Sequence, residues 1–474
     1  MGYHIGFIST RFCGADGVTL EASKWAEVFE KQGNTCFWLA GELDRPDANS
    51  HLVPEAHFKN ERNQRINRRI LGKATRSPAT TEEIHALRRL LKQRIRHFIE
   101  TFDIDVLVAE NVLTIPMHVP LGLAISEVIA ETGLPTIAHH HDFFWERPRF
   151  SVNAVGDYLQ NAFPPKLPSV QHVVINSEAK EQLALRCGLV GAVIPNVIDF
   201  AHPPRVSREG GEAFRRAMGL GEKEEIILQP TRVIQRKGIE HAIALTRALA
   251  DSRYKLVVTH EAGDEGFEYA EWLKTHARDN GVDLRLASVA LTDPWGAHEK
   301  GNGNGSGPSA GNNGYSLWDI YDQAAFVTYP SLYEGFGNAF LEAVYLKKPI
   351  LINRYRIFIR DIEPLGFKLA VMDGYLSADT VQYVRTILSS PALRREMTAH
   401  NYAVAAGNFS YGILDERLRS IMRAATGDAA YGKKVPLPGR PNIVYLDRFS
   451  EFQNRQFNSR DFDGRRHRRS ISAI

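Results

Sequence analysis

Cysteine is scarce in this chain of 474 residues, which contains three, at Cys13, Cys36 and Cys187. They are far apart, without the even number of a disulfide framework or the close spacing of a metal site. This argues against a disulfide-stapled secreted domain and favours a reducing compartment. The first residues form a strand-like run with no basic and apolar leader pattern, so we expect no secretory signal peptide.

Long hydrophobic runs and excess charge are also missing. The longest apolar region, at about 112–125, is interrupted by Pro116, His118 and Pro120 and is too short to span a bilayer. Lys and Arg number 58 against 55 Asp and Glu, a net charge of +3. Proteins that bind nucleic acid over much of their surface carry a larger positive charge than this chain, so we expect no nucleic acid partner. We expect a cytoplasmic protein, with association at the cytoplasmic face of a membrane as the alternative.

The length predicts two domains of roughly 200 residues each, because one hydrophobic core seldom serves 474 residues. Strand-like and helix-like segments alternate, and the alternation restarts near Ile194-Pro195-Asn196. Alternation of this kind predicts an α/β fold with parallel sheets covered by helices on both faces. The expected divisions are a first domain at 1–195, a second at 196–410, a helix at 411–427 that crosses back to the first domain, and a basic tail at 428–474.

Two basic segments leave alternatives open. Apolar residues at helical spacing between Glu61 and Phe102 predict one amphipathic helix with a basic face. That face is either solvated or contacts an anionic acceptor or membrane surface. The run Arg465-Arg466-His467-Arg468-Arg469 is either a loosely docked tail or a segment that binds phosphate-rich partners. The glycine-rich segment at 301–307 predicts a flexible insertion without chemistry.

Two carboxylates bracket a glycine-rich turn in the segment Glu334-Gly335-Phe336-Gly337-Asn338-Ala339-Phe340-Leu341-Glu342. The turn follows a predicted strand at 326–329 and opens a helix. Amides at a helix start face an anionic or hydroxyl-rich ligand, and glycines allow its close approach. The segment therefore predicts a sugar-nucleotide site. The alternative is an ordinary turn, with Glu342 placed early in a helix to suit its dipole.

Two cations, Arg232 and Lys237, follow another predicted strand, at 225–229, and precede a helix. They predict a diphosphate site, because Arg binds two oxygens at once and Lys supplies a point charge. Ligands of open α/β sheets bind beyond the carboxyl ends of the strands, where both this pair and the Glu334 turn lie. We therefore expect the two motifs to hold one ligand.

Polar residues end two predicted strands of the first domain. The segment His139-His140-His141-Asp142 ends one of them, and alternation places His139 and His141 on the same side. Glu110 and Asn111 end the neighbouring strand and are expected to share a role in binding a sugar or an acceptor. No further ligand lies at suitable spacing along the chain, so we expect no metal site.

Together these motifs resemble the retaining glycosyltransferases of family 4, which have the GT-B fold, over most of residues 3 to about 425. The stretch from Glu334 to Glu342 is similar to the E-x7-E motif of that family. The other similar segments are Thr231-Arg232 through Lys237-Gly238, Ile194-Pro195-Asn196, His141-Asp142 and the glycine loop Gly14 to Val18. The chain departs from the family pattern at Thr231 and Val197, where glycine is usual.

The resemblance implies roles for these residues. Arg232 and Lys237 bind the donor diphosphate and stabilise the leaving group, and His141 lies near the reacting sugar. The residues implied in catalysis are His141, Arg232, Lys237 and Glu334. Those implied in donor binding are Gly14, Gly17, Arg232, Lys237, Glu334, Gly335, Phe336, Gly337, Asn338 and Glu342, of which Glu342 binds the ribose. The acceptor-side candidates are Glu110, Asn111, His139 and Asp142.

The function that this resemblance implies is transfer of a hexose, with retention, from a UDP- or GDP-linked donor to a hydroxyl of a glycan, lipid or small molecule. Neither a metal nor another cofactor is expected, and front-face displacement is the expected route. Two alternatives stay open. One is a non-catalytic protein that binds an anionic polymer or a membrane surface; the other is a phosphorylase-like sugar enzyme on the same fold.

Overall fold

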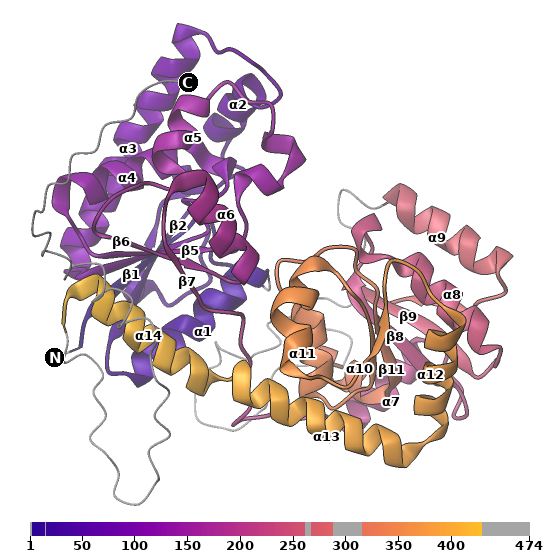
Figure 1. Ribbon diagram of the computed structural model, residues 1–474. Helices are drawn as coiled ribbons and strands as arrows, with labels where there is room; N and C mark the ends of the chain where they lie inside the picture. Colours follow the sequence, from indigo (N-terminus) through magenta and orange to yellow (C-terminus); the bar gives the residue numbers. More distant parts are fainter. Residues whose placement is uncertain (1, 15, 261–266, 288–314, 429–474) are drawn as a thin grey trace, which may run out of the picture. The chain divides into compact units, whose positions relative to one another are not determined.

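The computed structural model describes residues 2–14, 16–260, 267–287 and 315–428. The predicted insertion at 301–307 and the tail beyond 428 lie outside the described residues. Within these ranges the chain forms two parallel sheets, each with helices packed on both faces (Figure 1). Both sheets belong to one unit, Met1–Tyr431. The expected α/β class with two Rossmann-like domains is therefore confirmed.

The first sheet has the strand order β3-β2-β1-β4-β5-β6-β7 among the described residues, and its neighbouring strands pair in parallel. Its strands are β1 His4–Ile8, β2 Thr35–Ala40, β3 Ser50–Leu52, β4 Val106–Glu110, β5 Thr136–His140, β6 Val170–Val174 and β7 Gly191–Val193. Its helices are α1 Gly17–Lys31, α2 Glu61–Ile70, α3 Pro78–Phe102, α4 Val119–Thr132, α5 Gly156–Ala162 and α6 Ser177–Cys187. Crossover helices of this kind are what parallel pairing requires.

The second sheet has the order β10-β9-β8-β11-β12-β13 among the described residues, again with parallel pairs. Its strands are β8 Glu225–Arg232, β9 Tyr254–His260, β10 Leu284–Leu286, β11 Ala324–Tyr329, β12 Ile350–Asn353 and β13 Ala370–Met372. The helices that follow β7 are α7 Arg208–Ala217, α8 Ile239–Leu249, α9 Phe267–Asp279, α10 Leu317–Gln323, α11 Asn338–Tyr345, α12 Ala378–Ser389, α13 Pro391–Asn408 and α14 Tyr411–Thr426.

Single turns of helix shape several of the loops. They are η1 Asp47–Asn49, η2 Pro54–Ala56, η3 Pro116–His118, η4 Phe144–Glu146, η5 Pro148–Phe150, η6 Gln235–Lys237, η7 Phe358–Ile362 and η8 Glu363–Leu365. Helix η6 occupies the loop after β8 and carries Lys237, one of the two predicted diphosphate-binding cations, while Arg232 is the last residue of β8. Within the described ranges, no helix combines the length and the hydropathy needed to cross a bilayer.

The prediction of one helix between Glu61 and Phe102 is wrong, because the segment forms two helices, α2 and α3. Gly72, with φ +69°, takes a left-handed conformation that does not continue a helix. The second helix then starts afresh, with the Ser77 hydroxyl accepting from the Thr80 amide and Pro78 in its first turn. Serine caps and first-turn prolines are standard helix starts.

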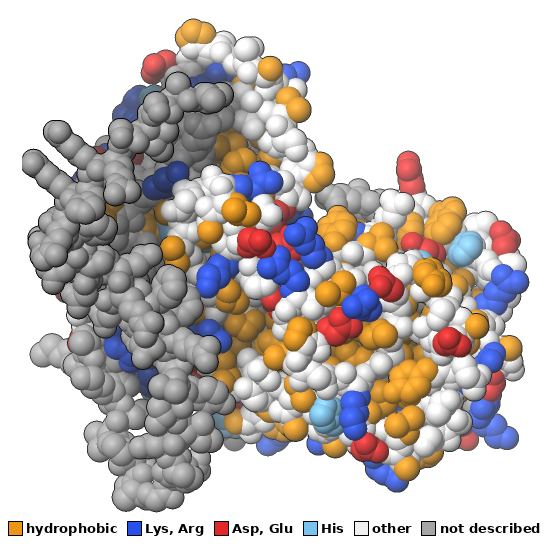
Figure 2. All heavy atoms as spheres, viewed as in Figure 1, with side chains coloured by type: hydrophobic (Ala, Val, Ile, Leu, Met, Phe, Trp, Pro, Cys, Tyr) orange, Lys and Arg blue, Asp and Glu red, His pale blue; other side chains and the backbone are white. Residues whose placement is uncertain are grey.

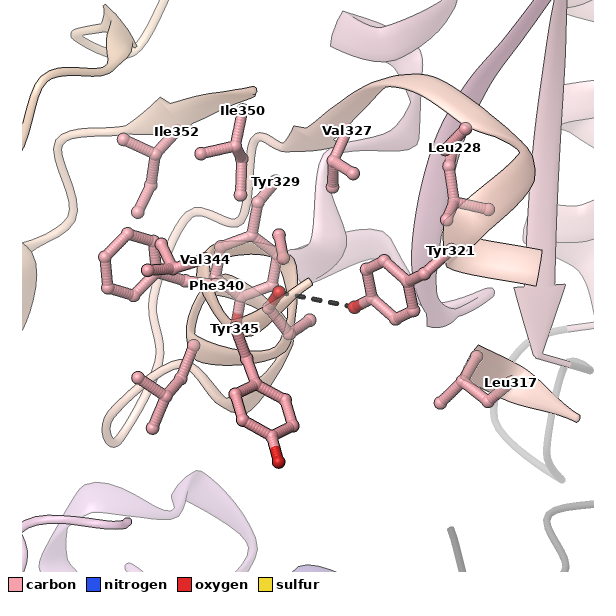
Figure 3. Packing of buried hydrophobic residues seen from close by; sticks show 14 of the residues in the cluster. Leu228, Leu317, Tyr321, Val327, Tyr329, Phe340, Val344, Tyr345, Ile350 and Ile352 are labelled. Atoms are coloured by element: carbon pink, nitrogen blue, oxygen red, sulfur yellow. Dashed lines mark hydrogen bonds between the residues drawn. The ribbon is translucent and has the colours of Figure 1, made fainter. Parts of the chain in front are cut away.

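The core beneath α11 fixes the turn that precedes it. Tyr329 on β11 and Phe340 on α11 are buried in one cluster with Val327 and Ile350 (Figure 3). The hydroxyl of Tyr321, which comes from α10 and is labelled in Figure 3, lies 3.3 Å from the Ala339 carbonyl oxygen. Since buried apolar side chains each stabilise the fold by about 1.5–3 kcal/mol, α11 has a fixed position beside β11.

Helix α14 packs against the first sheet, although it follows the second sheet in sequence. Its buried residues Leu414 and Leu418 belong to the same core as Trp25 and Phe29 of α1. On the outside, charges of both signs are intermixed over the face shown in Figure 2.

Candidate active site

Two loops of the second sheet meet at an ion pair. The Lys237 ammonium, at the end of η6 after β8, donates a hydrogen bond to the Glu334 carboxylate, in the loop after β11. Arg236 donates to the other Glu334 oxygen at 3.0 Å and to the Tyr333 carbonyl at 3.2 Å. The Lys237 and Glu334 side chains are only 11% and 10% exposed. Both oxygens of this carboxylate therefore have cationic partners.

Glycine is required at two positions of this site. Gly238 has φ +62°, and a Cβ placed there lies 2.5 Å from the Pro330 carbonyl oxygen. Gly337, directly before α11, has φ +124°, and its Cβ lies 2.5 Å from the Tyr355 hydroxyl. Only glycine adopts these conformations without strain and also allows such close approach. The glycines thus let the two loops touch and let α11 begin beside the carboxylate.

The local charge around this ion pair is positive. Burial raises the pKa of Glu334, but the nearby Lys237 and Arg236 cations outweigh burial and leave it below its usual value. The Lys237 pKa is lowered by burial, and Arg236 and Arg232 lower it further, while Glu334 opposes the shift. Arg232 itself ends β8 as an exposed side chain. Three cations against one carboxylate favour an anionic ligand.

Glu342, the second carboxylate of the motif, is held by a residue that the sequence did not single out. Tyr321 on α10 donates its hydroxyl to Glu342 at 2.9 Å. Burial raises the pKa of Glu342, and the hydrogen bond from Tyr321 opposes this shift. The Glu342 carboxylate therefore lies in the second turn of α11, and one of its oxygens is held by Tyr321 of α10.

A second polar cluster lies at the carboxyl ends of β4 and β5, where Glu110 and His139 are in register. His139 Nδ1 lies 3.0 Å and His141 Nε2 lies 3.4 Å from the same Glu110 oxygen. Burial raises the Glu110 pKa, but the two histidines reverse this and lower it to about 2. Burial lowers the His141 pKa, but Glu110 more than offsets this and raises it. The alternation predicted for His139 and His141 is confirmed, and Trp25 stacks on His139 with ring centroids 4.1 Å apart.

The premise that no third ligand accompanies these histidines is wrong, while the expectation of no metal site stays a prediction. Glu110, His139 and His141 each offer one ligand atom, and the three atoms lie within 4.8 Å of one another. Spacing along the chain missed Glu110 because it comes from the adjacent strand. Mixed imidazole and carboxylate sets of this kind suit zinc and related ions. The hydrogen bond between Glu110 and His139 also accounts for the geometry without an ion.

Three other predicted residues have structural partners. Asn111, with φ +53°, donates to Asp142 at 3.0 Å and accepts from the His141 amide at 3.1 Å. Arg147 donates to the other Asp142 oxygen at 2.5 Å. The Gly14 amide donates to Asp44 at 2.7 Å. Asn111 therefore fixes the backbone of His141.

Contacts between the two sheets bring loops of the first to the Glu334 turn. Asn176, which caps α6, donates to the Gly335 carbonyl at 2.7 Å, and Asn196 donates to Asn338 at 2.7 Å. A Cβ placed at Gly17 lies 3.9 Å from the Asn338 side chain, and one placed at Gly335 lies 3.5 Å from the His141 carbonyl. The predicted donor-binding turn and His141 therefore adjoin each other.

Sequence reasoning missed Arg236, Tyr321 and Asn176. Arg236 lies between Arg232 and Lys237 in the sequence. The spacing of these cations does not predict which of them contacts the Glu334 carboxylate. Tyr321 and Asn176 come from other elements, so their contacts depend on tertiary packing alone. Lys24 was also missed; this buried residue of α1 donates to Glu21 at 2.9 Å and to the Val197 carbonyl at 2.7 Å. Its partner Val197 belongs to the segment that connects the two sheets.

The chain is similar to two curated proteins over most of its length. Mannosylglucosylglycerate synthase of Thermotoga maritima is 30% identical over 438 residues, which cover 86% of this chain and 96% of that protein. Mannosylglucosylglycerate synthase of Petrotoga mobilis is 30% identical over 386 residues, or 77% and 85% of the two chains. No protein-family model matches the chain, so membership of family 4 is not established.

The fold is that of known glycosyltransferase structures. The Anabaena protein HepE, solved in complex with UDP and glucose, superposes with a TM-score of 0.60 over 89% of this chain and 99% of its own, at 12% identity. At that identity the likeness shows the fold, which is GT-B with its two Rossmann-like domains. Combined with the 30% identity to the Thermotoga maritima enzyme, it identifies the chain as a member of the mannosylglucosylglycerate synthase family of glycosyltransferases.

Proposed function

We propose that this protein transfers a hexose, with retention, from a UDP- or GDP-linked donor to a hydroxyl of a glycosylated glycerate. The observation that carries this proposal is the contact of Lys237 and Arg236 with Glu334 near the N-terminus of α11. This arrangement offers cations for a diphosphate, helix amides for an anion and a carboxylate for sugar hydroxyls within one small region.

The donor diphosphate is proposed to lie on Lys237 and Arg232, in front of the first amides of α11. Those amides have no acceptor inside the helix. Charge that develops on the leaving diphosphate is stabilised by Lys237, whose buried position strengthens the interaction. Glu342, in α11 itself, is proposed to accept hydrogen bonds from the ribose hydroxyls.

Front-face displacement is the proposed route to retention. Both Glu334 oxygens are held by cations, which makes this carboxylate a poor nucleophile and suits it to binding sugar hydroxyls. The His141 carbonyl adjoins the same turn. Its side chain, which faces Glu110, is proposed to lie beside the reacting sugar. No step of this route uses a metal ion.

The acceptor is proposed from the name of the relatives. Mannosylglucosylglycerate is a glycerate that carries two hexosyl units, so a hexosyl transfer to a glycosylated glycerate makes it. The same chemistry is proposed here, with glucosylglycerate as the first acceptor to test.

The test is a transfer assay with UDP-glucose, GDP-glucose, GDP-mannose and ADP-glucose against glucosylglycerate, with the anomeric configuration of the product read by NMR. The expected result is one preferred nucleotide sugar and a product that keeps the donor configuration. Inverted product contradicts retention. Release of hexose phosphate from a glycan by inorganic phosphate, without use of any nucleotide sugar, supports the phosphorylase-like alternative instead.

A further inference from the structure

A hollow of about 510 Å³ opens beyond the carboxyl ends of the first sheet. Its lining includes Arg11 from the loop after β1, Glu42 from the loop after β2, and His57, Lys59 and Asn60 from the segment after β3. A volume of this size lies within the roughly 300–1,000 Å³ range of small-molecule sites. A second hollow of about 460 Å³ also includes Lys59, together with Asn67, Arg68 and Arg149.

The charge of the two hollows is predominantly positive. The cations Arg11, Lys59, Arg68 and Arg149 line them, against the single carboxylate of Glu42. That carboxylate faces His57, whose Nε2 lies 3.2 Å from it.

Lys59 is shared by both hollows and has no carboxylate of its own. Among the described residues its ammonium makes no ion pair, and it lies over the Phe58 ring, 5.9 Å from the centroid. The Arg11 guanidinium lies over the same ring at 5.6 Å, and it pairs with Asp16 at 2.9 Å. Two cations thus flank one aromatic ring, and the one at Lys59 is available to an external anion.

The first hollow is connected to the transfer site through short contacts. Arg11 holds Asp16, which caps α1 by accepting from the Thr19 amide at 3.2 Å. The next residue, Gly17, adjoins Asn338 of the donor-side turn. On the other side, the Ser9 hydroxyl donates to the Glu110 carbonyl at 2.9 Å and so ties the end of β1 to the strand end that carries Glu110.

We propose that these two hollows form the subsite for the anionic end of the acceptor, with Lys59 as its carboxylate-binding residue. The assignment rests on the proposed function, in which the acceptor is a glycosylated glycerate. The cations offer charge-assisted hydrogen bonds to the carboxylate, while Glu42 and Asn60 offer acceptors for sugar hydroxyls. A phosphorylated glycerate presents the same anion chemistry, so the test includes it.

The experiment is calorimetric titration of three glucosides into the full-length protein, each with and without saturating nucleoside diphosphate. The glucosides are glucosylglycerate, neutral glucosylglycerol and glucosyl-3-phosphoglycerate. The variants are Lys59→Gln, Lys59→Arg and the control Lys166→Gln, which alters an exposed lysine outside both hollows. Thermal melts establish that each variant is folded.

We expect Lys59→Gln to weaken glucosylglycerate binding by about 10-fold or more, the effect of one lost charge-assisted hydrogen bond. Lys59→Arg and Lys166→Gln are expected to bind within about 3-fold of wild type. Glucosylglycerol is expected to bind wild type as weakly as glucosylglycerate binds Lys59→Gln. Tighter binding of the phosphorylated glucoside, with the same dependence on Lys59, supports the subsite and identifies its anion as a phosphate.

Equal binding of the charged and neutral glucosides by wild type overturns the proposal, as does unchanged glucosylglycerate binding by Lys59→Gln. Because titration measures binding and not turnover, it separates this proposal from the proposed function. If the protein transfers hexose to glucosylglycerate but does not need Lys59 to bind it, the proposed function stands and the proposed subsite is refuted. If the protein binds glucosylglycerate through Lys59 but transfers no hexose to it, the proposed subsite stands and the proposed function is refuted.

Discussion

Lys237 donates a hydrogen bond to Glu334 although the two residues are 97 positions apart in the chain. The contact joins the loops after β8 and β11, which are neighbouring strands of the second sheet. Since the carboxyl ends of parallel strands meet at one edge, this pair lies where an open α/β sheet binds its ligand. The proposed donor site is built around it.

Loss of either partner is expected to abolish most transfer. We predict that Lys237→Ala and Glu334→Ala each lower kcat/KM by about 100-fold or more, because each removes a contact to the donor in the transition state. Steady-state kinetics with the preferred donor measure this, with circular dichroism to establish folding. Near-normal turnover in either folded variant refutes the assignment.

A double variant separates catalysis from stability. Loss of Glu334 alone leaves the buried Lys237 ammonium without its carboxylate, and an uncompensated buried charge destabilises a protein by about 3–5 kcal/mol. Lys237→Met combined with Glu334→Gln removes both charges, so we expect it to regain much of the lost thermal stability and none of the activity. Recovery of activity together with stability indicates that the pair is only structural.

Arg236 is predicted to support Glu334 as its second cation. We expect Arg236→Gln to lower kcat/KM by roughly 10-fold, less than the loss of Lys237, because Arg236 holds the carboxylate and does not replace the diphosphate contact. Arg208→Gln is the matched control, since Arg208 is 89% exposed and pairs with Glu212 within α7. Equal effects of the two substitutions contradict a special role for Arg236.

Acid sensitivity should depend on Glu110. Its pKa of about 2 in the folded protein is below the ordinary 4.5, so its stabilising effect is present above pH 4.5 and is lost as the pH falls toward 2. The shift corresponds to about 3 kcal/mol. We predict that Glu110→Gln has a flatter decline in unfolding free energy between pH 5 and 3, measured by urea denaturation. Parallel curves for variant and wild type contradict the shift.

Transfer is predicted to survive removal of metal ions. After exhaustive treatment with EDTA, we expect kcat/KM to stay within about 2-fold of the untreated enzyme, since the proposed mechanism stabilises the leaving diphosphate with Lys237 and Arg232. Glu110→Gln serves as a second check, because it removes one member of the set with His139 and His141. Loss of activity that added Zn²⁺ or Mn²⁺ restores assigns a catalytic ion to this set.

The sequence predicted the second domain's framework best where strands are continuous apolar runs. The prediction of 225–229 falls within β8, and the predicted 326–329 falls within β11. Strands β12 and β13, which are four and three residues long, were not predicted. The helix break near Gly72 was also missed, since apolar spacing persists on both sides of it.

The sequence predicted those parts of the candidate site that lie at the carboxyl ends of strands. Lys237 and Glu334 follow adjacent strands, so the carboxyl-end rule expected them near each other. The contact of Glu110 with His139 depends on the register of β4 against β5, which no local pattern specifies. The contact of Arg236 with Glu334 depends on the conformation of η6. The contact of Tyr321 with Glu342 depends on the packing of α10 against α11. The roles assigned to these residues stay predictions.

A crystal structure of the protein with the preferred nucleoside diphosphate tests the central claim most directly. The account predicts that the diphosphate oxygens lie within hydrogen-bonding distance of Arg232 and Lys237 and in front of the first amides of α11, with the ribose hydroxyls at Glu342. A nucleotide bound elsewhere, with Lys237 and Glu334 still paired and both remote from it, contradicts the account.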